Sequence, residues 1–387
     1  MRLRMLPFEY GIRNLLRRPM RSLLTMIALT LVTTLIYCTI GFLQGLTRML
    51  AVSANPNTAI VFSINMGDNL EYSSIAMSTA GLIQGSVDGI SRTHGVTDIS
   101  PELFLGTQMT IADQSDSFGL LRGVTQQVFQ VRHGVQIVEG NWIKPGEILV
   151  GRLTAVKLGI DPEQLSLGNE LEFEGQQWRI AGIIDSGGGV FDSEIWCRLT
   201  DLQQATRRDD LSLVAVSCSN QSGFSAINLF CKRRYDLEIQ SMAEQDYFQS
   251  LNKDYGPIRK LGWLMVALIT ASGLFAGLNT MYGAVIGRTR EIAMLRTIGF
   301  GNKSITSSLI QEGILLGMAG AVLGFLLCRQ FVHGVSVRFT MGAFGLVLDG
   351  WTVACGCLTG MIVGAFGAFA PTLQALRKDI TSGLKHD

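Results

Sequence analysis

Few side chains in this chain of 387 residues combine the types and spacings that catalysis requires. No two of the four histidines have metal-ligand spacing; they are His94, His133, His333 and His386. The segment 299–304, Gly-Phe-Gly-Asn-Lys-Ser, imitates the end of a phosphate-binding loop, but Asn302 stands where that loop needs glycine. The sequence therefore predicts that the chain is not an enzyme, holds no cofactor and does not itself hydrolyse ATP.

The strongest argument for the alternative, an enzyme, comes from the carboxylates near the glycine run 187–189. Asp185, Asp192 and Glu194 could in principle bind a metal ion and support a membrane enzyme. Ordinary solvated carboxylates in a loop explain the same pattern with fewer assumptions. We therefore predict no metal site.

A short charged segment between two apolar runs carries a more specific pattern. Residues 287–305 read GRTREIAMLRTIGFGNKSI, with apolar Ile292, Leu295 and Ile298 at helical spacing. We expect a helix over 291–299 with these three side chains on one face and Arg288, Arg290, Glu291 and Arg296 around it. Gly299 is placed to end that helix in a left-handed conformation. The pattern favours an element that docks into a groove on another protein; a basic connecting loop is the alternative.

The elements on either side of this segment are apolar enough for a membrane. Mean hydropathy is +0.30, and the runs 22–46, 261–287 and 351–376 contain no Asp, Glu, Lys or Arg. The run 305–328 contains only Glu312. A helix of about 20 residues crosses the hydrocarbon core, so we predict four transmembrane helices. The first run exceeds the 7–15 apolar residues, roughly, of a cleavable signal, which favours a retained anchor.

Glu312 is the one ionisable residue within a predicted span. Acidic groups in a span are costly and usually face the bundle interior. A hydrogen bond to a neighbouring helix is the simpler explanation; a proton relay would need further such groups.

Charge segregation predicts the topology. Residues 47–259 hold 16 Lys and Arg against 25 Asp and Glu, whereas 288–304 and 377–387 together hold seven against three. Lys and Arg concentrate in short cytoplasmic loops, so we place both termini and the 288–304 loop in the cytoplasm and 47–259 outside. In residues 1–21 the arginines either line one face of an interfacial helix or only orient the first span.

Small residues recur four apart in the third and fourth spans. They are Gly313, Gly317, Gly320 and Gly324, and then Gly356, Gly360, Gly364 and Gly367. Such glycines let helix backbones approach closely in lipid. We expect helix packing here rather than a pore.

The external segment has a mixed α/β pattern. Short β-branched runs begin at Asn57 and Leu211, and residues 169–185 predict a hairpin that turns at Glu174-Gly175. Ile83, Val87 and Ile90 have helical spacing, and a polar helical stretch at 242–255 leads toward the second span. Cys197, Cys218 and Cys231 allow at most one disulfide, and the sequence does not decide whether one forms.

Here the chain resembles the permeases of FtsX-like ABC transporters, of the MacB, LolC, LolE and DevC class. The segment RTREIAMLRTIGFGNKSI resembles that family's signature between its second and third spans. LIQEGILLGMAGAVLGFLL, with Glu312, resembles its third span, and APTLQALRKDITSGLK the exit from its fourth. GEILVGRLTAVKLGI and VFDSEIWCRLTDLQQA, among others, resemble the MacB-type periplasmic core domain. Unlike MacB itself, this chain is expected to carry no ATPase domain.

The resemblance implies a stand-alone permease subunit of the type VII class in the bacterial cytoplasmic membrane. It implies a second permease protomer and a separate ATPase that binds ATP and magnesium and docks on the 288–304 loop. Hydrolysis would drive the external domain by mechanotransmission, for export or extraction of an unknown substrate, with a periplasmic adaptor as a further partner. An FtsX-like regulator of an extracytoplasmic partner, such as a cell-wall hydrolase, is the alternative. Membrane lipids are expected partners, and nucleic acid is not.

The expected organisation is four membrane-spanning α-helices and one α/β extracytoplasmic domain of MacB core type. In chain order we expect a cytoplasmic segment at 1–21, spans at 22–46, 260–287, 305–328 and 351–376, the external domain at 47–259, the coupling loop at 288–304, an external loop at 329–350 and a cytoplasmic tail at 377–387.

Overall fold

The computed structural model describes residues 17, 19–66, 69–111, 114–332, 334–340 and 342–377. Most of the predicted N-terminal interfacial segment and the tail after residue 377 lie outside the described residues. The chain divides into two compact units. The helical unit comprises Met1–Gln44, Pro257–Val335 and Leu346–Asp387, and the sheet unit comprises Gly45–Gly256 and Ser336–Gly345.

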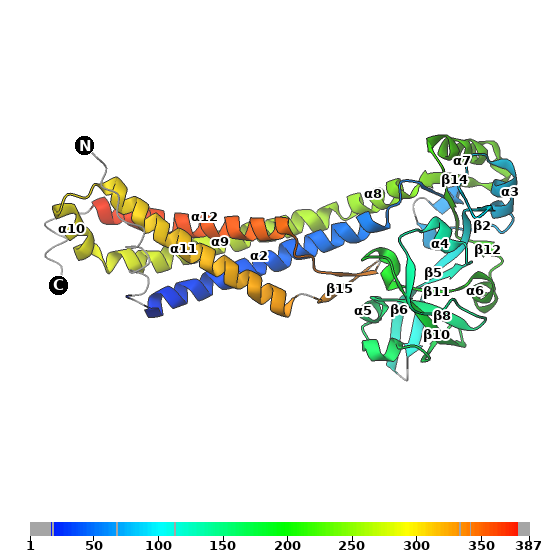
Figure 1. Ribbon diagram of the computed structural model, residues 1–387, viewed down its shortest axis with the longest axis horizontal. Coiled ribbons are helices and arrows are strands. Elements are labelled where there is room, and N and C mark those ends of the chain that lie inside the picture. The colour runs from blue at the N-terminus through cyan, green and yellow to red at the C-terminus, as the bar shows by residue number, and fades with distance from the viewer. Residues whose placement is uncertain are drawn as a thin grey trace. The chain divides into compact units, whose positions relative to one another are not determined.

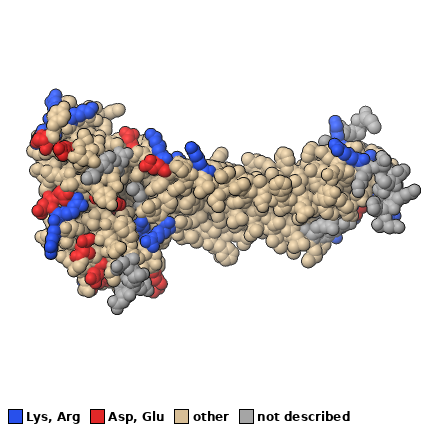
Figure 2. All heavy atoms as spheres, turned by 180° about the vertical axis from the view of Figure 1, so that it is seen from behind, with Lys and Arg blue, Asp and Glu red and all other residues tan. Residues whose placement is uncertain are grey.

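Four long helices dominate the helical unit (Figure 1). They are α2 (Pro19–Ser53), α9 (Gly256–Ile286), α11 (Asn302–Phe331) and α12 (Gly350–Arg377), and the short helix α10 (Thr289–Thr297) connects α9 to α11. All four are long and apolar enough to cross a membrane. Their surfaces in Figure 2 show almost no charged side chains between the helix ends, whereas the sheet unit shows both charge signs.

Contacts at glycines give the relative directions of these helices. A Cβ built on Gly320 would meet Leu29, and one on Gly324 would meet Thr33, so α11 and α2 run in the same direction. The equivalent contacts are Gly273 with Val32 and Gly262 with Leu43, and they show that α9 runs opposite to α2. Because Gly313 lies against Gly364 and Gly317 against Gly360, α12 runs opposite to α11. The four helices therefore alternate in direction.

The sheet unit is built on a mixed sheet of ten strands. Along the sheet the order is β14-β1-β13-β5-β6-β11-β8-β10-β7, and β9 pairs with β10 and β5. The strands are β1 (Thr58–Ser63), β5 (Ile99–Ile111), β6 (Gln114–Val124), β7 (Gln136–Gly140), β8 (Glu147–Gly151), β9 (Glu170–Phe173), β10 (Gln176–Asp185), β11 (Glu194–Arg198), β13 (Leu213–Ser217) and β14 (Ile239–Ala243). The β10–β8 and β11–β6 pairs are parallel.

Helices and small ladders complete the sheet unit. The helices are α3 (Thr79–Ser86), α4 (Val128–Val131), α5 (Thr154–Leu158), α6 (Leu199–Thr206), α7 (Gln221–Arg233) and α8 (Glu244–Asp254). The short strand pairs are β2 (Ile75–Ala76) with β12 (Asp210–Leu211), β3 (Arg92–Thr93) with β4 (Val96–Thr97), and β15 (Ser336–Phe339) with β16 (Gly342–Gly345).

The predicted hairpin is present, and its turn shows why. β9 and β10 pair directly across Glu174 and Gly175, both of which have positive φ, 50° and 69°. Positive φ at both central residues is what a two-residue hairpin turn of type I′ requires. The helix expected through Ile83, Val87 and Ile90 is only partly correct. It ends at Ser86, and Ile90 instead forms a β-bridge with Cys218.

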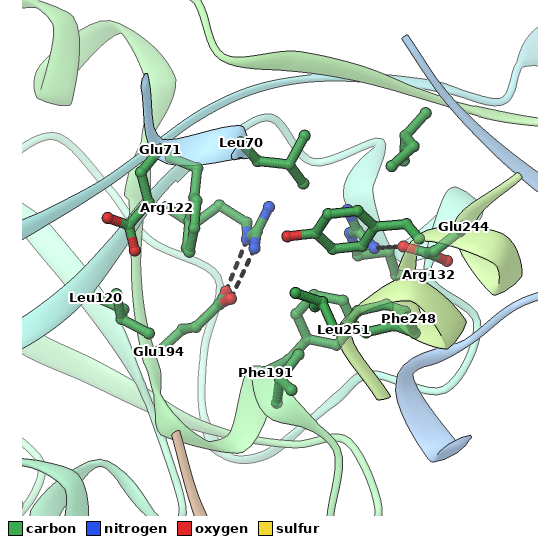
Figure 3. A pocket seen from close by; sticks show the side chains of 14 residues that line it. Leu70, Glu71, Leu120, Arg122, Arg132, Phe191, Glu194, Glu244, Phe248 and Leu251 are labelled. Atoms are coloured by element: carbon green, nitrogen blue, oxygen red, sulfur yellow. Dashed lines mark hydrogen bonds and ion pairs between the residues drawn. The ribbon is translucent and has the colours of Figure 1, made fainter. Parts of the chain in front are cut away.

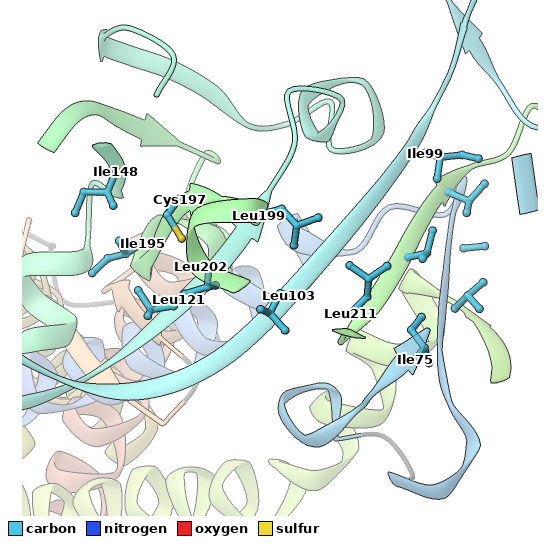
Figure 4. Packing of buried hydrophobic residues seen from close by; sticks show 14 of the residues in the cluster. Ile75, Ile99, Leu103, Leu121, Ile148, Ile195, Cys197, Leu199, Leu202 and Leu211 are labelled. Atoms are coloured by element: carbon cyan, nitrogen blue, oxygen red, sulfur yellow. The ribbon is translucent and has the colours of Figure 1, made fainter. Parts of the chain in front are cut away.

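Buried aliphatic side chains from both halves of the sheet form one core (Figure 4). Strand β5 joins the two halves, because Ile99–Glu102 pair with β13 and residues from Leu103 onward pair with β6. Leu103, Leu121 and Ile195 are fully buried in this core. Cys197, Cys218 and Cys231 are also buried, and all three are free thiols.

The predicted external loop at 329–350 is more than a connector. Its residues 336–345 form the β15–β16 hairpin, which belongs to the sheet unit. Lys157 Nζ on α5 donates hydrogen bonds to the carbonyl oxygens of Phe339 and Thr340, at 3.0 and 2.7 Å. Ser193 Oγ lies 2.7 Å from the backbone nitrogen of Ala343, which donates to it. The external domain is therefore made from two segments of the chain.

Candidate functional site

The segment 288–304 contains the helix that its sequence pattern predicts. Helix α10 spans Thr289–Thr297, and Gly299 has a φ of 98°, in the left-handed region. The backbone nitrogen of Gly299 donates to Arg296 O and that of Phe300 donates to Leu295 O, both at 3.1 Å. These two bonds form a Schellman motif. The glycine thus fixes where α10 ends and where α11 can begin.

One side of α10 faces its own helical unit. Ile292 is 5% exposed and clusters with Val285, Ile305 and Ala375, which come from α9, α11 and α12. Leu295 is partly buried beside this cluster, as is Phe300. The expectation that Ile292, Leu295 and Ile298 form one docking face is therefore wrong for Ile292. Its side chain holds α10 against the ends of three long helices.

The opposite side of α10 is available to a partner. Ile298, which directly follows α10, is 67% exposed and Met294 is 44% exposed. Arg290 is exposed next to them, whereas Glu291 and Arg296 are half-buried. We call Arg290, Met294 and Ile298 the exposed face of α10.

Arg288 and Glu312 form a buried ion pair that the sequence around neither residue predicts. Arg288 Nη1 donates to Glu312 Oε2 at 2.9 Å, and the two side chains are 6% and 7% exposed. Arg288 is the residue that precedes α10, and Glu312 lies within α11. A buried carboxylate is tolerated when it has a charged partner. The pair therefore explains how α11 accommodates Glu312, and it fixes the start of α10 to that helix.

The glycines of α11 and α12 lie where the two backbones touch. A Cβ on Gly317 would come within 2.1 Å of Gly360 O, and one on Gly313 within 2.2 Å of Gly364 O. Gly320 and Gly324 face α2 instead, where Thr33 Oγ1 donates to Gly320 O at 3.1 Å. Any larger residue at these four positions must push two helices apart. The α10 segment is thus connected to a tightly packed bundle.

A second polar cluster lies inside the sheet unit (Figure 3). Arg122 forms a two-bond contact with Glu194, at 2.7 and 2.6 Å, and a further bond to Glu102 at 2.6 Å. Arg132 donates twice to Glu102, at 3.0 and 2.9 Å, and once to Glu244. All five side chains are at most 5% exposed. We call these residues the buried charge network.

The network contains three carboxylates and two guanidinium groups. Burial alone would raise the pKa of Glu102, but Arg132 and Arg122 outweigh it and the net pKa shift is downward. Burial raises the pKa of Glu244 and exceeds the opposing effect of Arg132. The electrostatic reason is the count of partners, because Glu102 contacts both guanidinium groups and Glu244 only one.

The network borders an internal cavity of about 40 Å³, which Tyr247, Phe248 and Leu251 of α8 also line. Such a volume holds about one or two water molecules. The buried charge network holds α8 in the sheet unit, since Glu244 is the first residue of that helix.

The carboxylates near the glycine run are occupied by local contacts. Asp192 accepts from the backbone nitrogens of Ser186 and Gly188, and Asp185 pairs with Arg152 at 2.7 Å. Asp192 and Glu194 are buried, so the expectation of solvated loop carboxylates is wrong for both. Among the described residues, no group of three or more His, Cys, Asp or Glu side chains could hold a metal ion.

Family models match both parts of the chain. The MacB-like periplasmic core domain matches residues 22–227, which is more than half of the sequence, and the FtsX-like permease C-terminal domain matches residues 263–380. The chain therefore belongs to the MacB and FtsX-like family of ABC transporter permeases.

Two relatives match along nearly the whole chain. An uncharacterized ABC transporter permease, YknZ of Bacillus subtilis, is 19% identical and covers 97% of this chain and 98% of its own length. The macrolide export ATP-binding/permease protein MacB of Campylobacter jejuni is 20% identical over 98% of this chain. The present chain spans 61% of that MacB protein's length.

A solved structure covers a smaller part. The periplasmic region of MacB from Actinobacillus actinomycetemcomitans is 14% identical and covers 52% of this chain and 94% of its own, with a TM-score of 0.39.

Proposed function

We propose that this chain is the permease subunit of an ABC complex, and that α10 receives the movement of a separate ATPase subunit. The observation that carries the proposal is the division of α10 into two sides. Ile292 and the Arg288–Glu312 pair attach the helix to α9, α11 and α12. Met294 and Ile298 remain exposed on the other side.

The first step of the mechanism is docking. An apolar pair flanked by an arginine on a short helix suits a groove on a partner protein. Because α10 is bonded to α11 and packed on the ends of its neighbours, a displacement of α10 moves these helices together. A flexible connecting loop could not transmit force in this way.

The second step uses α8 and α9. Helix α9 follows α8 with only Tyr255 between them. Helix α8 is held in the sheet unit by the Glu244–Arg132 contact and by the buried side chains of Tyr247, Phe248 and Leu251. A movement of α9 is thereby transmitted to α8, which contacts the external domain through several residues. This is mechanotransmission without a substrate path through the bundle.

The proposed topology follows from charge and helix direction. Because the helices alternate in direction, both ends of the four-helix segment lie on one side in this proposal, and the basic loop at 288–304 supports the cytoplasm as that side. ATP and magnesium belong to the ATPase subunit in this proposal. A second permease protomer and an extracytoplasmic adaptor complete the complex.

The test is purification of the tagged full chain with its ATPase from mild detergent, comparing Met294→Asp and Ile298→Asp with the unchanged chain. Both substitutions place a charge on the exposed face of α10 and are expected to reduce ATPase co-purification by at least tenfold. Leu295→Asp is a poorer test, because Leu295 also packs beside Phe300. Tyr235→Asp is the matched control, since Tyr235 is 85% exposed in the sheet unit.

Each outcome has a definite meaning. Unchanged ATPase binding by both α10 variants would refute docking at this face. Capture of a cell-wall hydrolase instead of an adaptor would replace transport with regulation of that hydrolase. Failure to capture any ATPase with the unchanged chain, in its native membrane, would refute the permease mechanism itself.

A further inference from the structure

A groove between the first turns of α11 and the last turns of α12 has no role in the function proposed above. It has a volume of about 690 Å³, far larger than the cavity in the sheet unit. The lining residues are Asn302, Lys303, Thr306, Ser307, Ile310, Gln311, Ile314, Leu373, Leu376 and Arg377. We call it the α11–α12 groove.

Along α11 the lining of the groove changes from charged and polar residues to isoleucine. Lys303 and Arg377 stand at one end, and neither has an ion-pair partner among the described residues. Ile310 and Ile314 follow further along α11, with Gln311 between them, whereas Leu373 and Leu376 of α12 lie near the charged end, because α12 runs opposite to α11. The distance from Asn302 to Ile314 is about 18 Å along α11, at a rise of 1.5 Å per residue.

This gradient matches the depth profile of one membrane leaflet. Headgroup regions add roughly 5–7 Å on each side of the hydrocarbon core. In the proposed topology, residues 302–307 therefore lie at the cytoplasmic headgroup level, and Ile310 and Ile314 lie at the level of the acyl chains. Two cations at headgroup depth, with no ion-pair partner in the part of the chain that the structure describes, attract phosphate.

We propose that the α11–α12 groove binds an anionic phospholipid of the inner leaflet. Lys303 and Arg377 contact its phosphate, Thr306 and Ser307 offer hydroxyl donors to the headgroup, and an acyl chain lies along Ile310 and Ile314. The lipid fills a groove next to the α10 attachment and so supports the end of the bundle that receives the ATPase.

Charge complementarity favours this occupant over the chain's own remaining segments. Residues 1–16 carry Arg2, Arg4 and Arg13 against a single Glu9, so they are repelled by two further cations. Residues 378–387 hold two Lys and two Asp and offer no net negative charge. A phospholipid phosphate supplies both the charge and the apolar tail.

Native mass spectrometry of the full chain in neutral detergent tests the proposal, with phosphatidylglycerol, phosphatidylcholine and inorganic phosphate as separate probes. We expect one phosphatidylglycerol to be retained in preference to phosphatidylcholine, and no comparable retention of phosphate. Lys303→Gln/Arg377→Gln is expected to weaken phosphatidylglycerol binding roughly 30-fold, because this double variant removes both basic residues at the membrane surface. Arg329→Gln, at the other end of α11, is the matched control.

A second variant tests the acyl part of the site. Ile314→Trp fills the apolar part of the groove and leaves both cations, so it is expected to displace the lipid while a photoactivatable phosphatidylglycerol no longer labels α11 and α12. Equal retention of both lipids, unchanged binding by the double variant, or labelling elsewhere would overturn the proposal. So would equal binding of inorganic phosphate, which would indicate a site for free anions, or cross-linking of a partner protein in the groove. None of these results depends on whether an ATPase docks on α10.

Discussion

The helical unit and the sheet unit both bury charged side chains, but they do so in different ways. In the helical unit one arginine meets one glutamate, Arg288 with Glu312, and the surrounding contacts are made by glycine backbones. In the sheet unit five charged side chains share six hydrogen bonds around two arginines. The pair is balanced in charge, whereas the network carries one carboxylate more than its arginines can neutralise.

The difference follows from how the two units are built. Parallel and antiparallel strands bring residues from β5, β6 and β11 side by side, so several long side chains can converge on one guanidinium group. Close-packed helices bury the Arg288–Glu312 pair next to the glycine contacts of α11. The sheet unit is therefore stabilised by many coupled contacts, and the helical unit by a few contacts at fixed positions.

The largest expected effect is loss of a central member of the network. Arg122→Met leaves Glu194 without its two-bond partner and removes one bond from Glu102, at an expected cost of about 3–5 kcal/mol of unfolding free energy. Thermal unfolding of the full chain, followed by tryptophan fluorescence, measures it.

Arg152→Met is the control for that measurement. Its partner is Asp185, but the Arg152 side chain is 61% exposed, so the expected cost is about 0–1 kcal/mol. Equal costs for the two substitutions would contradict the role given to the network.

A smaller effect is expected from the glycine contacts of the helical unit. Gly317→Val places a side chain against Gly360 O, and overpacking of this kind costs about 1–3 kcal/mol. Gly283→Val is the control, because a Cβ at Gly283 meets nothing within 4 Å. Denaturation of the full chain in mixed micelles should show loss of stability in the first variant only.

The ion pair can be tested by a double-mutant cycle. Arg288→Met and Glu312→Leu each remove one member of the pair and keep the other charge buried, whereas the double variant removes both. We expect the double variant to be more stable than the sum of the single changes predicts, by about 0.5–3 kcal/mol. Strict additivity in the same micelle assay would show that the two residues do not interact in the membrane.

The smallest effect concerns pH and the surplus carboxylate. The pKa of Glu244 is raised in the folded chain, so the folded state binds more protons than the unfolded state above the ordinary pKa of 4.5. Its contribution to stability is therefore present at low pH and is lost as pH rises from about 4.5 through the folded pKa. Glu102, whose pKa is lowered, acts in the opposite sense below 4.5.

Glu244→Gln keeps an acceptor for Arg132 and cannot ionise. We expect its melting temperature to fall less than that of the unchanged chain when pH is raised above 4.5. If the melting temperatures of the two proteins fell equally as pH rises, Glu244 would not be the group that takes up the proton.

Several features of this chain could be predicted because they depend on near neighbours. Apolar runs predicted the four long helices, and alternation around Glu174-Gly175 predicted the β9–β10 hairpin. Gly299 ends α10 as expected, because a left-handed residue is a local requirement. The helix through Val87 was overextended because spacing alone does not show that Ile90 bonds to a strand.

What the sequence by itself determined was therefore the identity of the elements, and the motif between the second and third spans. The tertiary structure alone decided which side of α10 faces inward, which arginine neutralises Glu312 and which glycines touch. It also placed the 336–345 hairpin with the external domain. The physical reason is distance along the chain: Gly317 and Gly360, or Arg122 and Glu194, are brought together by the packing of whole helices and strands. No local propensity records that packing.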